Sequence, residues 1–256
     1  MKKLLYIYGP VSSWRLGRSL GIDMVKGAKR CNFDCVYCQI GPSARYALRR
    51  RVFVPTGRII KELASLPHVA IDYITFSGMG EPTLASNLGD AIRKVKSMRK
   101  EPVAVLTNSL LLGRKDVKRD LSCADFVVAK LDAFSDRSFC DINRPGVKTA
   151  FSRIIKGLIL FRKDYQGKFA LQIMFTRQNR RNAHKLAELS KKIDPDEVQI
   201  NTPLRPSRTN ALGPDEIAKI KRSFHGMNAV TVYDSRRKRV APLNAKDIFI
   251  RRGTPT

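Results

Sequence analysis

Three of the five cysteines in this chain lie close together, at Cys31, Cys35 and Cys38. Their spacing is C-x3-C-x2-C, within the stretch KRCNFDCVYCQIG that covers residues 29–41. Thiolates bind zinc and iron–sulfur clusters, and both kinds of site ordinarily have four protein ligands. A loop that offers only three thiolates therefore predicts a site with one coordination position left open.

A [4Fe–4S] cluster fits this pattern best, because three cysteines leave one of its irons free to bind a small molecule. A zinc site is the second interpretation, but none of the histidines (His68, His184 and His225) lies within a few residues of the loop. The remaining cysteines, Cys123 and Cys140, are isolated, and we expect them to be structural. Three structural thiols without a metal are the third interpretation. An odd number of cysteines with three clustered does not fit a disulfide framework and indicates a reducing compartment.

The charge of the chain is strongly positive. Its 256 residues include 49 Lys and Arg but only 22 Asp and Glu, which gives a net charge of +27. Such a charge attracts polyanions whatever the fold, so it predicts a nucleic acid or another anionic partner. A generally basic proteome is the alternative explanation.

The remaining composition is that of a globular domain, with 43% hydrophobic and 28% charged residues. No apolar run approaches the roughly 20 residues of a membrane span. Gly9-Pro10 interrupts the short apolar stretch at the N-terminus and no small-residue cleavage site follows, so we expect no signal peptide. The sequence predicts a cytoplasmic protein with no membrane partner.

Short β-branched runs alternate with amphipathic runs from residue 19 onward. The predicted strands are 19–25, 72–78, 102–109, 125–132, 168–175, 197–203 and 228–233. The predicted helices are 56–66, 86–98, 114–121, 149–163, 182–193 and 214–224. About six βα units in succession predict an α/β fold with a parallel sheet, a single-domain partial (β/α)6 barrel of the TIM-like kind. A doubly wound open sheet has the same order of elements and is the alternative.

Three parts of the chain are expected around this pattern. Residues 1–18 are expected to be an N-terminal extension, residues 19–233 the core domain, and residues 234–256 a peripheral basic C-terminal tail. In a barrel, functional groups lie where strands end and βα loops begin. The ends of the predicted strands hold a glycine-rich acidic loop with Gly80, Glu81 and Pro82, and the polar residues Asn108, Lys130, Asp132 and Asn201.

The cysteine spacing, with the aromatic Tyr37 before Cys38, resembles the signature of the radical S-adenosylmethionine (SAM) superfamily. The fold of that superfamily is a full or partial (β/α) barrel, in agreement with the predicted elements. The resemblance implies that Cys31, Cys35 and Cys38 hold a [4Fe–4S] cluster whose free iron binds the amine and carboxylate of SAM. One electron from an external donor would then cleave SAM to methionine and a 5′-deoxyadenosyl radical, which abstracts hydrogen from a substrate. In such enzymes the cofactor carries the chemistry and the protein positions it.

The resemblance also implies which residues contact SAM. The stretch FSGMGEPTL (76–84) takes the place of the family's glycine–glutamate loop, so Gly80, Glu81 and Pro82 are expected to receive the SAM amine. An ammonium group needs close acceptors, and glycine lets the backbone approach. Taken alone, the same stretch is an ordinary turn. Tyr37 is expected to pack against the adenine or, equally, to be a core aromatic residue.

Later strand ends supply the remaining expected contacts. Lys130 suits the SAM carboxylate, or is a lysine whose stem lies along apolar surface. Asp132 suits the ribose or a structural hydrogen bond. Asn108 is expected near the ribose or at a turn, and Asn201 and Gln172 are expected near the adenine or the substrate.

Within the superfamily, several stretches resemble the wyosine-tRNA-synthase-like Fe–S oxidoreductases. They are YGPVSSWRLGRSLGID, CNFDCVYCQIG, TFSGMGEPTL, INRPG (142–146) and VQINTPLRP (198–206). True wyosine synthase adds carbons from pyruvate to guanosine 37 of phenylalanine tRNA and carries a second cluster on N-terminal cysteines, whereas this chain has no cysteine before Cys31. The resemblance implies a tRNA substrate, which the positive charge suits. A radical SAM activase or other enzyme that modifies an acidic protein, and a nucleic-acid-binding protein with a structural metal, are the alternatives.

Overall fold

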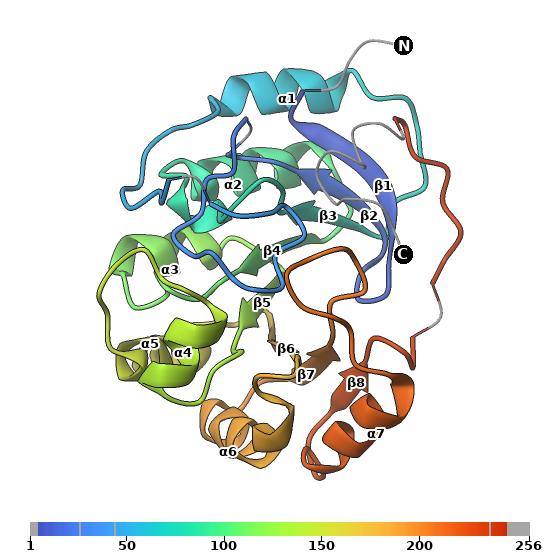
Figure 1. Cartoon of the computed structure of the whole chain (residues 1–256). Helices are drawn as coiled ribbons and strands as arrows, with labels where there is room; N and C mark the ends of the chain where they lie inside the picture. Colours follow the sequence, from blue (N-terminus) through green and yellow to red (C-terminus); the bar gives the residue numbers. More distant parts are fainter. Residues whose placement is uncertain (1–4, 26, 44, 236, 245–256) are drawn as a thin grey trace.

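The computed structural model describes residues 5–25, 27–43, 45–235 and 237–244, and one curved sheet runs through its centre (Figure 1). The sheet has eight strands in the order of the sequence, β1 to β8. They are Ile7–Ser13 (β1), Gly17–Ile22 (β2), Tyr73–Phe76 (β3), Val103–Thr107 (β4), Phe126–Lys130 (β5), Lys168–Met174 (β6), Glu197–Asn201 (β7) and Ala229–Thr231 (β8). Strands β2 to β8 pair in parallel, and β1 pairs antiparallel with β2.

Helices cover the outer side of this sheet and leave the other side as the inside of a half-barrel (Figure 1). They are Thr56–Ala64 (α1), Leu88–Met98 (α2), Lys115–Leu121 (α3), Asp136–Ile142 (α4), Phe151–Asp164 (α5), Ala183–Ile193 (α6) and Pro214–Arg222 (α7). Short 3-10 turns occupy Pro82–Leu84 and Arg180–Asn182. Because the strand order never reverses, the doubly wound alternative is wrong and the partial barrel is confirmed.

Two elements were not predicted. Strand β1 lies in the segment expected to be an N-terminal extension. It was not predicted because it contains Gly9-Pro10, and a proline in a sequence argues against a strand. The structure tolerates the proline at an irregularity, where the pairing with β2 shifts register between Tyr8 and Val11. The other is the seven-residue helix α4, which begins after the capping residue Ser135.

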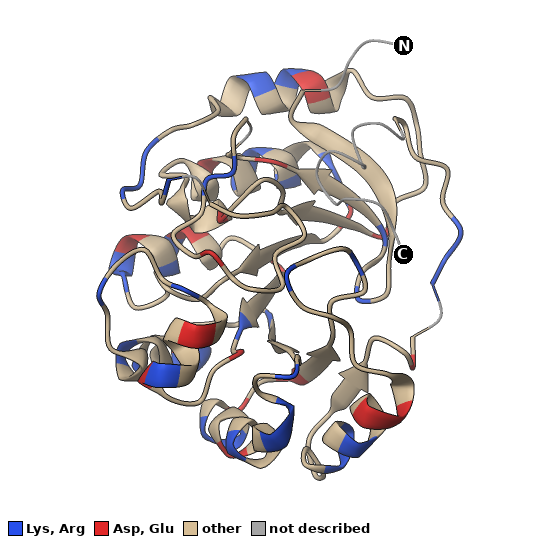
Figure 2. Ribbon diagram, viewed as in Figure 1, with Lys and Arg blue, Asp and Glu red and all other residues tan. Residues whose placement is uncertain are grey.

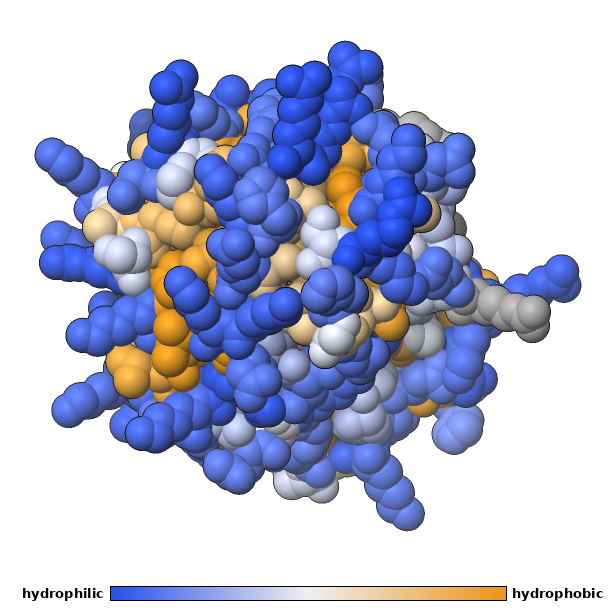
Figure 3. All heavy atoms as spheres, turned by 90° about the horizontal axis from the view of Figure 1, so that it is seen from below, coloured by the Kyte–Doolittle hydropathy of each residue, from blue (hydrophilic) through white to orange (hydrophobic). Residues whose placement is uncertain are grey.

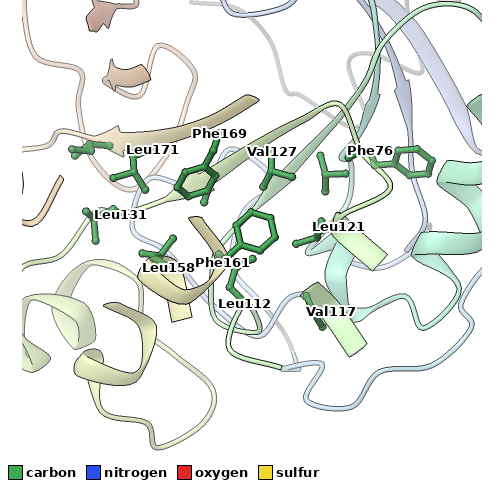
Figure 4. Close-up of a cluster of buried hydrophobic side chains, with 14 of the residues drawn as sticks. Phe76, Leu112, Val117, Leu121, Val127, Leu131, Leu158, Phe161, Phe169 and Leu171 are labelled. Atoms are coloured by element: carbon green, nitrogen blue, oxygen red, sulfur yellow. The ribbon is translucent and has the colours of Figure 1, made fainter. Parts of the chain in front are cut away.

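The main core lies between the sheet and the helices (Figure 4). Strand residues that point outward, such as Val127, Phe169 and Leu171, pack there against helix residues such as Leu158 and Phe161. Because side chains alternate along a strand, their neighbours point to the inside of the half-barrel. The inner face begins with a small apolar cluster of Leu16, Ala104, Phe126, Val128 and Ala170.

The same alternation continues to polar residues at the carboxyl ends of the strands. Along β5, Lys130 follows Phe126 and Val128 on the inner face, and along β6, Gln172 follows Ala170. The apolar cluster therefore forms one end of the barrel interior, and polar side chains fill the other. This arrangement positions the candidate site.

Lys and Arg residues are distributed over the helices and several loops (Figure 2). Seen from below the view of Figure 1, the surface is mostly hydrophilic, with apolar patches between the charged side chains (Figure 3). Not all of the positive charge faces solvent: the Arg50 side chain is 8% exposed and pairs with Asp116 and Asp120. No helix among the described residues combines the length and apolar character that a membrane span requires.

Candidate functional site

The inside of the half-barrel contains a cavity of about 500 Å³, and most of the predicted site residues line it. Those that do are Cys31, Cys35, Tyr37, Cys38, Gly80, Glu81, Asn108, Lys130, Gln172 and Asn201. Pro82 and Asp132 do not line the cavity. The fold thus gathers residues from the ends of β2 to β7 around one space, as the barrel prediction requires.

The three cysteines lie on the loop that follows β2. Backbone hydrogen bonds shape this loop, with the Cys38 N–H 3.1 Å from the Cys35 carbonyl and the Ala47 N–H 2.9 Å from the Cys31 carbonyl. Burial raises the pKa of the Cys31 thiol well above its ordinary value, and the neighbouring Cys35 adds to the effect. Burial, together with nearby Asp132, raises the pKa of Cys35 to about 11. Neighbouring buried thiols of this kind need a strong positive charge to become thiolates, and a bound metal cluster supplies one.

Three thiols that line one cavity are a donor set that suits an iron–sulfur cluster. Among the described residues, no group of three His, Cys, Asp or Glu side chains is placed to hold a single metal ion. Thiolates on one zinc ion converge at about 2.3 Å from it, whereas each thiolate of a four-iron cluster binds a different iron and stands farther from the others. The residues present therefore fit a cluster.

The segment after α4 holds the cysteine loop from the side. Its backbone pairs with the loop at three places: the Val36 N–H to the Ile142 carbonyl (2.9 Å), Asp34 to Asn143 (3.1 Å) and Gly146 to Asn32 (2.8 Å). This segment is the INRPG stretch, for which the sequence suggested no role. The backbone bonds show that it is part of the site.

The side chain of Asn143 extends this contact to a thiol. Its amide nitrogen donates to the Cys35 sulfur (3.6 Å), the Tyr37 hydroxyl (3.3 Å) and the Asp132 carboxylate (3.0 Å). On the other side of the loop, the Asn108 amide donates to Asn32 (2.5 Å) and lies 3.7 Å from the Cys31 sulfur. Two of the three cysteine sulfurs thus receive an amide N–H.

Glu81 is used as an acceptor by the protein itself. Its carboxylate accepts from the Thr83 backbone and hydroxyl (3.0 and 2.6 Å), the Thr107 hydroxyl (2.7 Å) and the Asn108 backbone (2.7 Å). A carboxylate has about four acceptor sites, so these donors largely occupy it. Burial raises the pKa of Glu81, and these hydrogen bonds act in the opposite direction. Glu81 therefore ties its loop to the end of β4, and its expected contact with the SAM amine stays a prediction.

Gly80 and Pro82 have different places in the same loop. Gly80 pairs with Arg30, the residue before Cys31, so closely that a side chain at this position would collide with the Arg30 carbonyl. Pro82 begins a buried 3-10 turn that Glu81 caps, and it is not among the residues that line the cavity. Its expected contact with SAM stays a prediction.

Lys130 is held in the cavity by three neighbours. Its ammonium lies 3.0 Å from Asp132, 3.3 Å from the side-chain oxygen of Gln172 and 4.8 Å from the centre of the Tyr37 ring. Asp132 also accepts from the Tyr37 hydroxyl and from the backbone of Met174 (2.7 Å). These bonds show the structural hydrogen bonding that was one of the two predicted roles of Asp132, and its contact with the ribose stays a prediction. The Tyr37 pKa is raised well above its ordinary value by burial and by Asp132.

Two amide side chains complete the inner wall. Asn201 lines the cavity, and its side-chain oxygen accepts from the backbone of Thr202 (2.9 Å). The side-chain nitrogen of Gln172 is buried and has no hydrogen-bond partner within the part of the chain that the structure describes. A buried donor without a partner is costly, so this nitrogen marks a place for a ligand acceptor.

Sequence reasoning missed four further residues that line the cavity. These are Trp14 and Arg15 in the turn between β1 and β2, Arg205 after β7, and Arg237 after β8. Arg237 belongs to the expected C-terminal tail, of which residues 237–243 contact the core domain. They run beside β1, where the Ser12 hydroxyl donates to the Lys238 carbonyl (2.6 Å) and the Leu243 N–H to the Gly9 carbonyl (2.8 Å). The basic residues after position 244 lie outside the described residues.

Comparison with known sequences is consistent with this site. The sequence model of the radical SAM superfamily matches residues 25–190. A UPF0026 protein of Synechocystis is 40% identical over 201 residues, which cover 78% of this chain and 76% of that protein. A UPF0026 protein of Methanocaldococcus jannaschii is 35% identical over 230 residues, which cover 87% of this chain and 71% of that protein. These names state the family and do not mention wyosine.

Solved structures share the fold at low sequence identity. A radical SAM methyltransferase from Sphaerobacter thermophilus superposes with a TM-score of 0.63 at 16% identity, covering 92% of this chain and 69% of that one. SuiB of Streptococcus suis bound to S-adenosylmethionine gives a TM-score of 0.61 at 15% identity. That match covers 80% of this chain and 48% of SuiB, so the chain spans about half the length of SuiB. At these identities the likeness shows the fold alone.

Proposed function

The chain belongs to the radical SAM superfamily and, within it, to the UPF0026 family, and from this premise we propose that it abstracts hydrogen from an RNA substrate. Members of the superfamily use a [4Fe–4S] cluster and SAM. When bound, these cofactors supply a 5′-deoxyadenosyl radical. The protein residues have to hold the cofactors, exclude water and position the substrate.

Cys31, Cys35 and Cys38 would hold the cluster. They are the cysteines that line the cavity, and the backbone bonds from residues 142–146 fix the loop that carries them. The amide groups of Asn108 and Asn143 point N–H dipoles toward two of the sulfurs, which favours the additional negative charge of a reduced cluster. The open iron would face the cavity, where SAM would bind.

SAM would be held by the polar inner wall. Lys130 offers an ammonium group to a carboxylate, and the side-chain nitrogen of Gln172 offers a donor that the protein leaves unused. Asn108 and Asn201 line the same wall. Backbone groups of the loop at Gly80, which come close because there is no side chain, would receive the amine.

The main observation in support of an RNA substrate is the positive charge of the residues that line the cavity. Its charged lining residues are Arg15, Lys130, Arg205, Arg237 and Glu81, and the only carboxylate among them is buried and used by four protein donors. A cavity with this balance favours an anionic substrate, and the net charge of +27 extends the attraction to a polyanion. The resemblance of several stretches to wyosine-tRNA-synthase-like proteins supports tRNA as that polyanion.

Anaerobic reconstitution with iron and sulfide tests the enzyme assignment. We expect the protein to bind about four irons and, with a reductant, to convert SAM to 5′-deoxyadenosine. Cys35→Ala should abolish this conversion, whereas the matched variant Cys140→Ala, at an exposed cysteine outside the cavity, should not. Cleavage that survives in Cys35→Ala contradicts the assigned ligand.

A binding experiment tests the substrate class. tRNA should bind with an affinity that falls steeply as salt increases, because the contacts neutralise phosphates. If tRNA fails to bind at low salt while an acidic protein binds, the substrate is a protein and the RNA proposal is wrong.

A further inference from the structure

The cavity has two chemically different ends. The cysteine loop follows the carboxyl end of β2, whereas Trp14 and Arg15 come just before its amino end. The six residues of β2 separate these ends by about 20 Å, at roughly 3.3 Å per residue. Because the cluster and SAM would bind at the cysteine end, the end at Trp14 is the part of the cavity that remains for the substrate.

The turn that carries Trp14 and Arg15 is held in place. The Ser13 hydroxyl accepts from the backbone N–H groups of Arg15 (3.3 Å) and Leu16 (3.2 Å). Leu16 is buried in the inner apolar cluster, which fixes the turn to the barrel interior. The Arg15 guanidinium lies 5.2 Å from the centre of the Trp14 ring, so the two groups form a cation–π pair at the cavity wall.

Two more arginines reach this cavity from distant parts of the chain. Arg205 comes from the loop after β7, at the cysteine end of the cavity, and Arg237 from the segment that runs beside β1, near the Trp14 end (Figure 1). Lys238, beside Arg237, pairs with Asp72 at the start of β3 (3.1 Å), which fixes this segment near the turn. An aromatic ring and three guanidinium groups thus line one cavity together.

Arginine forks match the geometry of phosphate oxygens, and aromatic rings stack on nucleobases. We propose that the Trp14 end of the cavity is a recognition subsite for a nucleotide of the RNA substrate, with its base on Trp14 and its phosphate on Arg15 and Arg237. This subsite rests on the proposed function and gives it a location. The nucleotide held there guides the reacting part of the substrate toward the cysteine end.

Trp14 is the only tryptophan of the chain, so its fluorescence reports on the subsite directly. The experiment uses the full chain and titrates it with GMP, with total tRNA and with a poly-glutamate peptide. We expect GMP and tRNA to quench the fluorescence and the peptide to leave it unchanged. Quenching by the peptide but not by GMP overturns the nucleotide assignment.

Variants measured by the anisotropy of labelled tRNA complete the test. Trp14→Ala should weaken binding about tenfold because a stacking contact is lost, and Trp14→Phe should restore most of it. Arg15→Ala should reduce the dependence of log Kd on log salt by about one phosphate contact. The matched control is Arg137→Ala, which removes the same charge from a side chain that is 94% exposed on α4 and outside the cavity.

Equal effects of Arg15→Ala and Arg137→Ala overturn the subsite, because only the net charge would then matter. Unchanged tRNA affinity in Trp14→Ala overturns the stacking contact. These outcomes are separate from the proposed function, which fails instead if the wild-type protein, reconstituted with its cluster, does not cleave SAM. A protein that cleaves SAM and binds tRNA without a change in Trp14 fluorescence keeps its function and lacks this subsite.

Discussion

Replacing Gly80 with alanine should separate the glycine loop from the cysteine loop. A Cβ atom built on Gly80 lies 1.7 Å from the Arg30 carbonyl oxygen and 2.5 Å from the Arg30 carbonyl carbon. These are backbone atoms next to Cys31, so no side chain can rotate away. Since such contacts are essentially never shorter than 3.0 Å, one of the two loops has to move by at least 1.3 Å.

The cost of this movement follows from what it breaks. The two loops share hydrogen bonds from Arg30 N–H to the Met79 carbonyl (2.9 Å) and from Glu81 N–H to the Arg30 carbonyl (3.0 Å). Losing both costs about 1–3 kcal/mol, and overpacking adds about 1–3 kcal/mol. We expect Gly80→Ala to lower the free energy of unfolding by about 2–6 kcal/mol. We also expect it to displace Cys31 and lower the iron content after reconstitution.

Urea unfolding of the apoprotein and iron analysis after reconstitution measure the two effects separately. Gly57→Ala is the matched control, because Gly57 lies exposed in α1 and a Cβ there meets nothing within 4 Å. That variant should be neutral or more stable by up to about 1 kcal/mol. If Gly80→Ala unfolds at the same urea concentration as Gly57→Ala and binds as much iron, the close approach of the two loops is needed neither for stability nor for iron binding, and the prediction is wrong.

Three further perturbations test other parts of the site. Asn143→Ala removes an N–H from the Cys35 sulfur and should lower the midpoint potential of the reconstituted cluster by roughly 40–60 mV, measured by redox titration with EPR detection; an unchanged potential contradicts the hydrogen bond. Lys130→Met should weaken SAM binding about 10–100-fold in calorimetry, and equal affinity would remove Lys130 from the SAM site. Hydrogen bonds from Arg18 hold the pKa of Asp72 well below its usual range. The ionised Asp72 therefore stabilises the fold fully at pH values above about 4, the pKa of an aspartate in the unfolded chain. This stabilisation decreases as the pH falls below about 4. Asp72→Asn should therefore be less stable than the wild type at about pH 7 and more nearly equal at about pH 3 in urea unfolding, and a constant difference would refute the linkage.

Sequence patterns were sufficient for the elements whose signal is local. The alternation of β-branched and amphipathic runs located β2 to β8 and most of the helices, because burial on one face imposes a period that the chain itself displays. The spacing of Cys31, Cys35 and Cys38 indicated the radical SAM superfamily for a similar reason, since one short loop carries the whole signature. The position of Lys130, Asn108 and Asn201 at strand ends predicted that they meet, because parallel strands end at one edge.

Contacts between distant residues were decided by the tertiary structure. Asn143 reaches the sulfur of Cys35 across 108 positions, and nothing in the sequence around either residue indicates that contact. Asp132 and Pro82 stand at strand ends like their neighbours, yet the fold turns one into a buried acceptor and the other into the core of a turn.

The open side of the barrel shows the same division. The net charge, which follows from composition alone, predicts an anionic partner. Only the folding of β1 back against β2, and of residues 237–243 along β1, brings Trp14, Arg15 and Arg237 to one cavity. The sequence by itself determined the superfamily, because the cysteines that identify it lie in one short loop. The tertiary structure decided which distant residues share the cavity, because the cavity wall is assembled from both ends of the chain.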